Sequence, residues 1–482
     1  MGTLNKKALV GLKWSALERL LTQSIQLLVM LMLARILGPE TFGLVGMLSI
    51  LIVVSNVLVD SGLSSALIRE QSRSESDYAT VFYASLTFSI VCYLILYFSA
   101  EPISNFYSQP KLESLVKVLA ITIIIDSVTI VHKAKLSIEL DFRTQAKVSL
   151  ISVTLSGFMG ILFANYGFGV WSLVVQNISS SFFSMFILNC IVPWRPKFQF
   201  NMESFSRLFK FGYKLLLADL INAIYQNIYQ LLIGKVFDAK SVGIFTQSNQ
   251  ISRMPSVALT MIVQKVTFPY FSKLQHDKGL NKLYFIVIKL TASLVFPTLI
   301  GLSILSDNLV SLVLGDVWQE SSALISIISI GMMLYPIHAI NLNYLKVKGR
   351  SDIILRAEII KKIIMTIILI ITIRFGVFGI CLGMMIQSYI SLFINIYYSA
   401  SVGSLTLREQ LLPLTSIWVA SIFSFILGKE FSLWFTNDDV FVVISTLFVS
   451  LPIYIMVVLI FNRDLYSILR NFLSSKKGSV YD

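Results

Sequence analysis

The segment LARILGPETFGL at positions 33–44 has an ungapped counterpart 200 residues later, IGKVFDAKSVGI at positions 233–244. In this alignment Arg35 corresponds to Lys235 and Gly43 corresponds to Gly243. A second pair of similar turns, YGFG at 166–169 and FGVFG at 375–379, lies later in each half. Such weak internal symmetry in an apolar chain is typical of transporters, and it would place a substrate path between two lobes. The alternative is chance similarity between apolar helices.

Long apolar stretches surround these repeats and occupy most of the chain. Each is close to the roughly 20 residues that a helix needs to cross the hydrocarbon core of a bilayer. Barrel strands would show short alternating segments instead, so the pattern favours α-helices. We predict about fourteen spans, at residues 11–35, 41–67, 79–100, 115–132, 148–165, 169–192, 211–234, 242–264, 284–305, 320–344, 353–374, 377–399, 411–428 and 441–461.

The composition supports a membrane protein and excludes several other classes. Charged residues make up 13% of the 482 residues, where soluble domains carry about 25%. Hydrophobic residues make up 56%, and the mean hydropathy is +0.78. A soluble enzyme, a secreted disulfide scaffold and a disordered protein are therefore excluded. Cys92, Cys190 and Cys381 lie far apart in apolar runs without metal spacing, so we expect no disulfide, metal or cofactor.

The net charge of +13 follows the predicted topology. If the N-terminus is placed on the inner side and the chain crosses fourteen times, the inner segments hold 27 Lys and Arg residues and the outer segments hold seven. The positive-inside rule then predicts that both termini are cytoplasmic. The basic balance is thus a signal of orientation, and we expect no nucleic-acid partner.

The expected architecture is an all-α integral membrane protein with a central cavity between two pseudo-symmetric six-helix lobes. The N-terminal lobe covers residues 1–200 with the first six spans, and the C-terminal lobe covers residues 201–400 with the next six. Residues 401–482 add two spans and a cytoplasmic tail.

Polar side chains form stripes at helical spacing on the first two spans of each half. A polar stripe on a membrane helix has to face protein or water. One hydrated cavity shared by these spans accounts for the stripes, whereas hydrogen bonding between packed helices is the alternative. The predicted polar lining consists of Gln23, Gln26, Asn56, Asn222, Gln226 and Gln250.

Nine charged residues are predicted at membrane depth, where one central charge costs about 2.5–3.5 kcal/mol on translocon scales. A guanidinium matches phosphate in a bidentate fork, so the cations are candidates for binding an anionic head group. Pairing with an acid, or snorkelling of the lysines, is the alternative. The acids either couple transport to ions or neutralise the cations. The cations are Arg19, Arg253, Lys289, Lys361 and Lys362, and the acids are Glu18, Asp60, Asp126 and Asp219.

Several motifs, taken in order, resemble a known family. They are ARILGPETFG at 34–43, DSGLSSALIR at 60–69, LDFR at 140–143, VGIFTQ at 242–247, and Met254-Pro255 followed by FPYFSKLQ at 268–275. This order is similar to that of the Wzx-type polysaccharide transporters, which are flippases for lipid-linked oligosaccharides. They belong to the multidrug/oligosaccharidyl-lipid/polysaccharide exporter superfamily.

The resemblance implies a task, a location and partners. The task would be to move undecaprenyl-pyrophosphate-linked repeat units of O-antigen, capsule or exopolysaccharide across the bacterial inner membrane by alternating access. The partners would be that lipid-linked substrate, membrane lipids, and a polysaccharide polymerase with its chain-length machinery. The sequence contains neither a P-loop nor a nucleophile elbow, so we expect no enzyme. A multidrug cation antiporter of the same superfamily and a membrane polysaccharide polymerase remain the alternatives.

Overall fold

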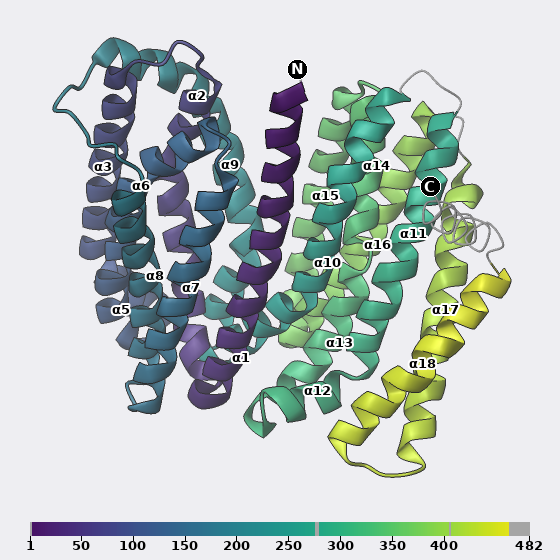
Figure 1. Ribbon diagram of the computed structural model, residues 1–482. Coiled ribbons are helices and arrows are strands. Elements are labelled where there is room, and N and C mark those ends of the chain that lie inside the picture. The colour runs from purple at the N-terminus through teal and green to yellow at the C-terminus, as the bar shows by residue number, and fades with distance from the viewer. Residues whose placement is uncertain (1, 275–278, 404–405, 462–482) are drawn as a thin grey trace, which may run out of the picture. The chain divides into compact units, whose positions relative to one another are not determined.

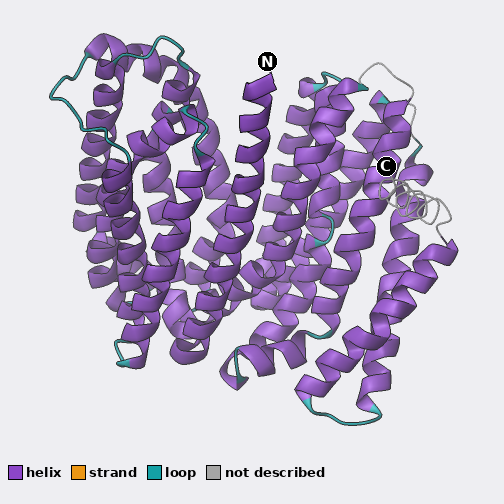
Figure 2. Ribbon diagram, in the orientation of Figure 1, coloured by secondary structure: helices purple, strands orange, loops and turns teal. Residues whose placement is uncertain are grey.

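The computed structural model describes residues 2–274, 279–403 and 406–461. Every regular element in these ranges is a helix (Figure 2). Ten segments of the described part of the chain are long and apolar enough to cross a membrane. The predicted all-α membrane fold is therefore confirmed.

Two of the ten segments are about twice the length of one span. Leu21–Arg69 has 49 residues and Ser351–Val402 has 52, or about 75 Å each at ~1.5 Å per residue. Gly38, with φ of 73°, and Gly376, with φ of 75°, interrupt them near their middles. Glycine adopts such a φ without the steric cost that a Cβ imposes. If both segments cross twice and the polar helices α9 and α10 also cross, the total reaches fourteen, so this count stays a prediction.

The helices divide into two compact units, which we call the N-unit, Met1–Thr246, and the C-unit, Gln247–Asp482. This division follows packing, whereas the predicted lobes follow the sequence repeat. The lobe boundaries near residues 200 and 400 therefore stay predictions. The N-unit contains α1 (Gly2–Asp60), α2 (Leu63–Arg69), α3 (Glu75–Phe98), α4 (Ala100–Tyr107), α5 (Lys111–Leu119), α6 (Ile121–Ile138), α7 (Phe142–Asn165), α8 (Val170–Ile191), α9 (Met202–Val236) and the start of α10 (Ala239–Lys273) (Figure 1).

Small residues allow the helices of the N-unit to approach closely. A Cβ at Gly157 of α7 would lie 2.5 Å from the side chain of Val29 on α1. A Cβ at Gly62 would lie 2.4 Å from the carbonyl oxygen of Gly212 on α9. Lipid provides little hydrophobic drive between helices, so close backbone packing of this kind is a main source of their association. It fixes α7 and α9 against α1 and α2.

The two copies of the sequence repeat meet at a glycine crossing. A Cβ on Gly43 would lie 1.6 Å from the carbonyl oxygen of Ala239, and a Cβ on Gly243 would lie 1.8 Å from that of Pro39. These two contacts exchange under the same shift of 200 residues that aligns the repeats. The crossing therefore has local two-fold pseudo-symmetry. It supports the interpretation that the two segments are related copies rather than a chance match.

The C-unit is built around a buried tyrosine on α11. Tyr284 is fully buried, and its ring centroid lies 4.9 Å from that of Tyr344 on α14. Aliphatic side chains of α11, α14, α16, α17 and α18 complete this core. The C-unit contains the rest of α10, α11 (Gly279–Ile304), α12 (Ser306–Val313), η1 (Asp316–Trp318), α13 (Glu320–Met332), α14 (Tyr335–Val347), α15 (Ser351–Thr372), η2 (Ile373–Phe375), α16 (Gly376–Val402), α17 (Leu407–Leu433) and α18 (Asp439–Phe461).

Candidate functional site

A polar pocket lies inside the N-unit, where the end of α1 and the start of α2 face the middle of α6. Its volume is about 370 Å³. Three residues predicted for the site, Asn56, Asp60 and Asp126, line it together. We call it the N-unit pocket, and its polar lining consists of Asn56, Asp60, Ser64, Asp126, Ser127, Thr129 and Lys133.

The two carboxylates of the N-unit pocket lie at different places in their helices, Asp60 at the end of α1 and Asp126 inside α6. Asp60 ends α1 and accepts a hydrogen bond from the backbone N–H of Ser64 in the first turn of α2. Asp126 lies two turns before Lys133 on α6, and the charges of these two side chains attract each other. Both carboxylates are half-buried. The pocket therefore presents two acids and one base to whatever enters it.

The hydroxyls behind these charges are used within the helix bundle. Thr129 donates a hydrogen bond to the carbonyl oxygen of Asp126 at 2.8 Å. Ser127 donates to the carbonyl oxygen of Ile124 at 2.7 Å and accepts from Ser89 of α3 at 3.1 Å. These hydrogen bonds satisfy hydroxyls that are fully buried, as the interior of a membrane bundle requires.

The C-unit holds a buried cation with partners of its own. Lys361 on α15 is 9% exposed, and its Nζ lies 2.5 Å from Glu358 Oε1 and 3.3 Å from Asn395 Oδ1 on α16. The Asn395 amide also contacts His338 Nδ1 on α14, at 3.2 Å. His338 Nε2 lies 3.4 Å from the hydroxyl of Ser388. We call Glu358, Lys361, Asn395, His338 and Ser388 the C-unit network.

The remaining candidates lie along α9, α10 and α11. On α9, Asp219, Asn222 and Gln226 are exposed, and the Gln226 amide donates to Asn222 Oδ1 at 3.1 Å. Lys289 and Lys362 are half-buried, and Gln250 is exposed. On α1, Gln23 is half-buried and Gln26 is exposed. The side chains of Glu18 and Arg19 lie outside the part of the chain that the structure describes.

Arg253 lies on a side of α10 different from the one that packs within the C-unit. Ser252 and Ser256 donate hydrogen bonds to backbone carbonyls of α13, at 3.2 Å to Ile325 and 2.7 Å to Met332. Arg253 and Gln250 are three residues apart and share one helix face. Arg253 is half-buried and Gln250 is exposed. The predicted polar stripe on α10 therefore lies on two faces of the helix. The serines face α13, whereas Gln250 and Arg253 lie on a different face.

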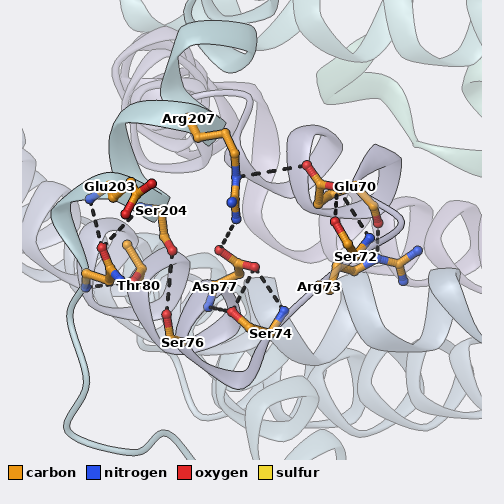
Figure 3. A network of polar contacts seen from close by, with 11 residues as sticks. Glu70, Ser72, Arg73, Ser74, Ser76, Asp77, Thr80, Glu203, Ser204 and Arg207 are labelled. Atoms are coloured by element: carbon orange, nitrogen blue, oxygen red, sulfur yellow. Dashed lines mark hydrogen bonds and ion pairs between the residues drawn. The ribbon is translucent and has the colours of Figure 1, made fainter.

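A polar cluster joins the start of α9 to the α2–α3 turn (Figure 3). The buried carboxylate of Asp77 accepts from the Arg207 guanidinium at 2.6 Å and forms a capping box with Ser74. Glu70, whose pKa is held below its usual value by a hydrogen bond from the Ser72 hydroxyl, lies 4.0 Å from the same arginine. We call Glu70, Ser74, Asp77 and Arg207 the α9 clasp. It anchors one end of α9 beside the helices that carry the N-unit pocket.

An apolar cavity of about 550 Å³ lies among α10, α11, α17 and α18 in the C-unit. Leucine, valine, isoleucine, proline and phenylalanine side chains form most of its wall. Its polar side chains are satisfied locally, since Tyr454 donates to the carbonyl oxygen of Ser293 at 2.9 Å and Thr298 to that of Leu294 at 2.8 Å. The cavity therefore suits a hydrocarbon chain better than a polar group.

Sequence reasoning missed parts of both polar regions. It left Lys133 out of the predicted site, although this lysine lies at helical spacing from Asp126 and Thr129. It gave no role to Asn395 or His338, because each is a single polar residue in an apolar run. In the described ranges no group of His, Cys, Asp and Glu is placed to hold a metal ion.

Comparisons with known proteins cover most of the chain. The model of a family described as "Polysaccharide biosynthesis protein" matches residues 32–323, which is more than half of the chain. The teichuronic acid biosynthesis protein TuaB of Bacillus subtilis is 28% identical over 73% of this chain and 74% of its own. The lipopolysaccharide biosynthesis protein WzxC of Escherichia coli is 23% identical over 82% of this chain and 81% of its own.

Among solved structures, the lipid II flippase MurJ in its inward closed conformation matches the fold. Its TM-score is 0.76, at 16% identity, over 94% of this chain and 99% of that one. At this identity the likeness describes the arrangement of helices alone. It agrees with an all-helical membrane protein.

Proposed function

The chain belongs to the polysaccharide biosynthesis protein family, and from this premise we propose that it is a flippase for lipid-linked oligosaccharides. The predicted resemblance to the Wzx type is confirmed by that match and by the similarity to WzxC. The cargo would be undecaprenyl-pyrophosphate-linked repeat units of O-antigen, capsule or exopolysaccharide, moved from the inner to the outer leaflet of the bacterial inner membrane. The family match is the observation that carries this proposal. The protein acts as a transporter and not as an enzyme.

The physical difficulty of this task is the head group. A pyrophosphate loses hydration as it leaves water, and fixed cations offset that loss. Arg253 is the strongest candidate to contact it, because its guanidinium lies on a side of α10 not bonded to α13. Arg19, Lys289 and Lys362 are further candidates. Lys361 is a weaker one, since its ammonium is already met by Glu358 and Asn395.

The prenyl tail needs an apolar path while the head group crosses. The apolar cavity among α10, α11, α17 and α18 offers one, with no charged side chain in its lining. Alternating access between two lobes is the mechanism that supports this separation of tail and head group. In the same proposal both termini are cytoplasmic, and a polymerase with its chain-length machinery receives the cargo outside.

The proposed function is tested by depleting the protein in cells that make a surface polysaccharide. We expect surface polymer to fall and undecaprenyl-pyrophosphate-linked units to accumulate, which extraction and mass spectrometry would measure. Unchanged polymer without accumulation would reject the flippase. Increased sensitivity to cationic drugs, with normal polymer, would instead support the antiporter alternative.

The contact of Arg253 with the head group is tested by two variants at equal protein level. Arg253→Lys keeps a charge without the fork and should retain more surface polymer than Arg253→Ala. Wild-type output from both variants would remove Arg253 from the binding site.

A further inference from the structure

The N-unit pocket is too large for a dehydrated ion. A water occupies about 30 Å³, so the 370 Å³ of the pocket holds about a dozen. An ion such as Ca²⁺ or Na⁺ would need most of its oxygen ligands within about 2.6 Å, which leaves most of this volume unused. The volume falls instead in the range of about 300–1,000 Å³ that is common for organic ligands.

The carboxyl groups of the N-unit pocket disfavour a phosphate as its occupant. The lining places two carboxyl groups, those of Asp60 and Asp126, beside one ammonium group, that of Lys133. Asp219 adds a further repulsion close to Asp60. An anionic group entering here would lie next to more carboxyl groups than ammonium groups, which is unfavourable for it. The pyrophosphate therefore needs a different place, and the occupant of the pocket is neutral or positively charged.

The hydrogen-bond donors and acceptors in the lining of the N-unit pocket match the hydroxyl groups of a polyol. Ionised carboxylates only accept hydrogen bonds, whereas an ammonium only donates them. A sugar hydroxyl does both, so adjacent hydroxyls on one ring can donate to Asp126 and accept from Lys133. The amide of Asn56 adds one further donor and acceptor on the α1 side.

We propose that the N-unit pocket is a glycan subsite, which receives an uncharged or amino-substituted sugar of the lipid-linked unit. This inference rests on the proposed function and deepens it. It separates the recognition of the sugar, by two carboxylates and a lysine in the N-unit, from the recognition of the phosphate by cations elsewhere. It also assigns to Asp60 and Asp126 a role other than ion coupling.

Two probes separate the sugar from the phosphate. One is undecaprenyl pyrophosphate, and the other is undecaprenyl pyrophosphate carrying the oligosaccharide extracted from cells depleted of the protein. Binding of each to the purified full-length protein gives a ratio of affinities that reports the sugar alone. We expect wild-type protein to bind the sugar-bearing probe more tightly.

The double variant Asp60→Asn/Asp126→Asn should lower the affinity for the sugar-bearing probe about tenfold or more, since it removes two charged acceptors. Its affinity for the bare pyrophosphate probe should stay within about twofold. Glu139→Gln, an exposed acid near the end of α6 and outside the pocket, is the matched control and should change neither affinity.

A second variant keeps the test independent of charge. Ile130→Phe adds bulk to the half-buried wall of the pocket and should cause the same selective loss. The subsite is overturned if folded variants keep the wild-type ratio, or if both affinities fall equally. Wild-type protein that binds neither probe would overturn the proposed function, and the subsite with it.

Discussion

The N-unit pocket and the C-unit network contain the same kinds of side chain and use them in opposite ways. In the C-unit network Lys361 is 9% exposed and bonded to Glu358 and Asn395. In the N-unit pocket two half-buried carboxylates and a lysine surround about 370 Å³ of space. A charged residue in a membrane helix is therefore weak evidence for a binding site by itself. The space left around it, and the partners it already has, decide between structure and function.

The largest effect on stability should come from breaking the C-unit network. Lys361→Ala removes hydrogen bonds to Glu358 and Asn395, and we expect the free energy of unfolding to fall by about 2–3 kcal/mol. Titration of the purified protein with SDS would measure the change. Arg356→Ala, at an exposed position on the same helix, is the control. A variant as stable as wild type would show that the contacts of Lys361 do not contribute to stability.

The α9 clasp is a bonded polar cluster in the same unit as the N-unit pocket. It therefore tests whether bonded clusters stabilise the fold in either unit. Asp77→Ala removes the capping box and the ion pair with the half-exposed Arg207. A lost cap costs about 1 kcal/mol, and a pair of this exposure adds up to about 1 kcal/mol. Thermal unfolding should therefore show a loss of about 2 kcal/mol. Glu203→Ala, an exposed acid in the first turn of α9, serves as the comparison and should have little effect.

A smaller effect is expected at Tyr284. Its hydroxyl oxygen lies 2.5 Å from Asn341 Oδ1 and 2.6 Å from Gln410 Oε1, and its single hydrogen can be donated to one of these two acceptors. Tyr284→Phe leaves the Ser399 hydroxyl, at 3.1 Å from both oxygens, as a remaining donor. We expect a loss of about 1 kcal/mol, measured by the same SDS titration, and no change in the sugar preference. A changed preference would connect the C-unit core to sugar recognition.

The smallest effect on stability should be in the N-unit pocket. Asp126→Asn changes a half-buried group beside open space, so we expect the free energy of unfolding to change by less than about 0.5 kcal/mol. Binding of the sugar-bearing probe should nevertheless weaken. A loss of stability as large as that of Lys361→Ala would make Asp126 a structural residue and remove the contrast.

Much of the fold was predictable because it depends on local composition. Apolar length predicted an all-helical membrane protein, and the shift of 200 residues aligned Gly43 with Gly243, which the structure brings into contact. The site was less predictable because it depends on which side chains already have partners. Lys361 and Arg253 look alike in the sequence, yet only the contacts with Glu358 and Asn395 distinguish the first. Lys133 is absent from the predicted site because its place near the end of a predicted span does not reveal the pocket beside it.

Flippase activity can be measured directly as transport by the purified protein. Vesicles with lipid-linked oligosaccharide in the inner leaflet would be prepared with and without the protein, and the sugar reaching the outer leaflet would be measured with an impermeant lectin. The account predicts outer-leaflet sugar well above the level of protein-free vesicles, with less in the Asp60→Asn/Asp126→Asn variant. A signal equal to that of protein-free vesicles, from folded wild-type protein, would contradict it.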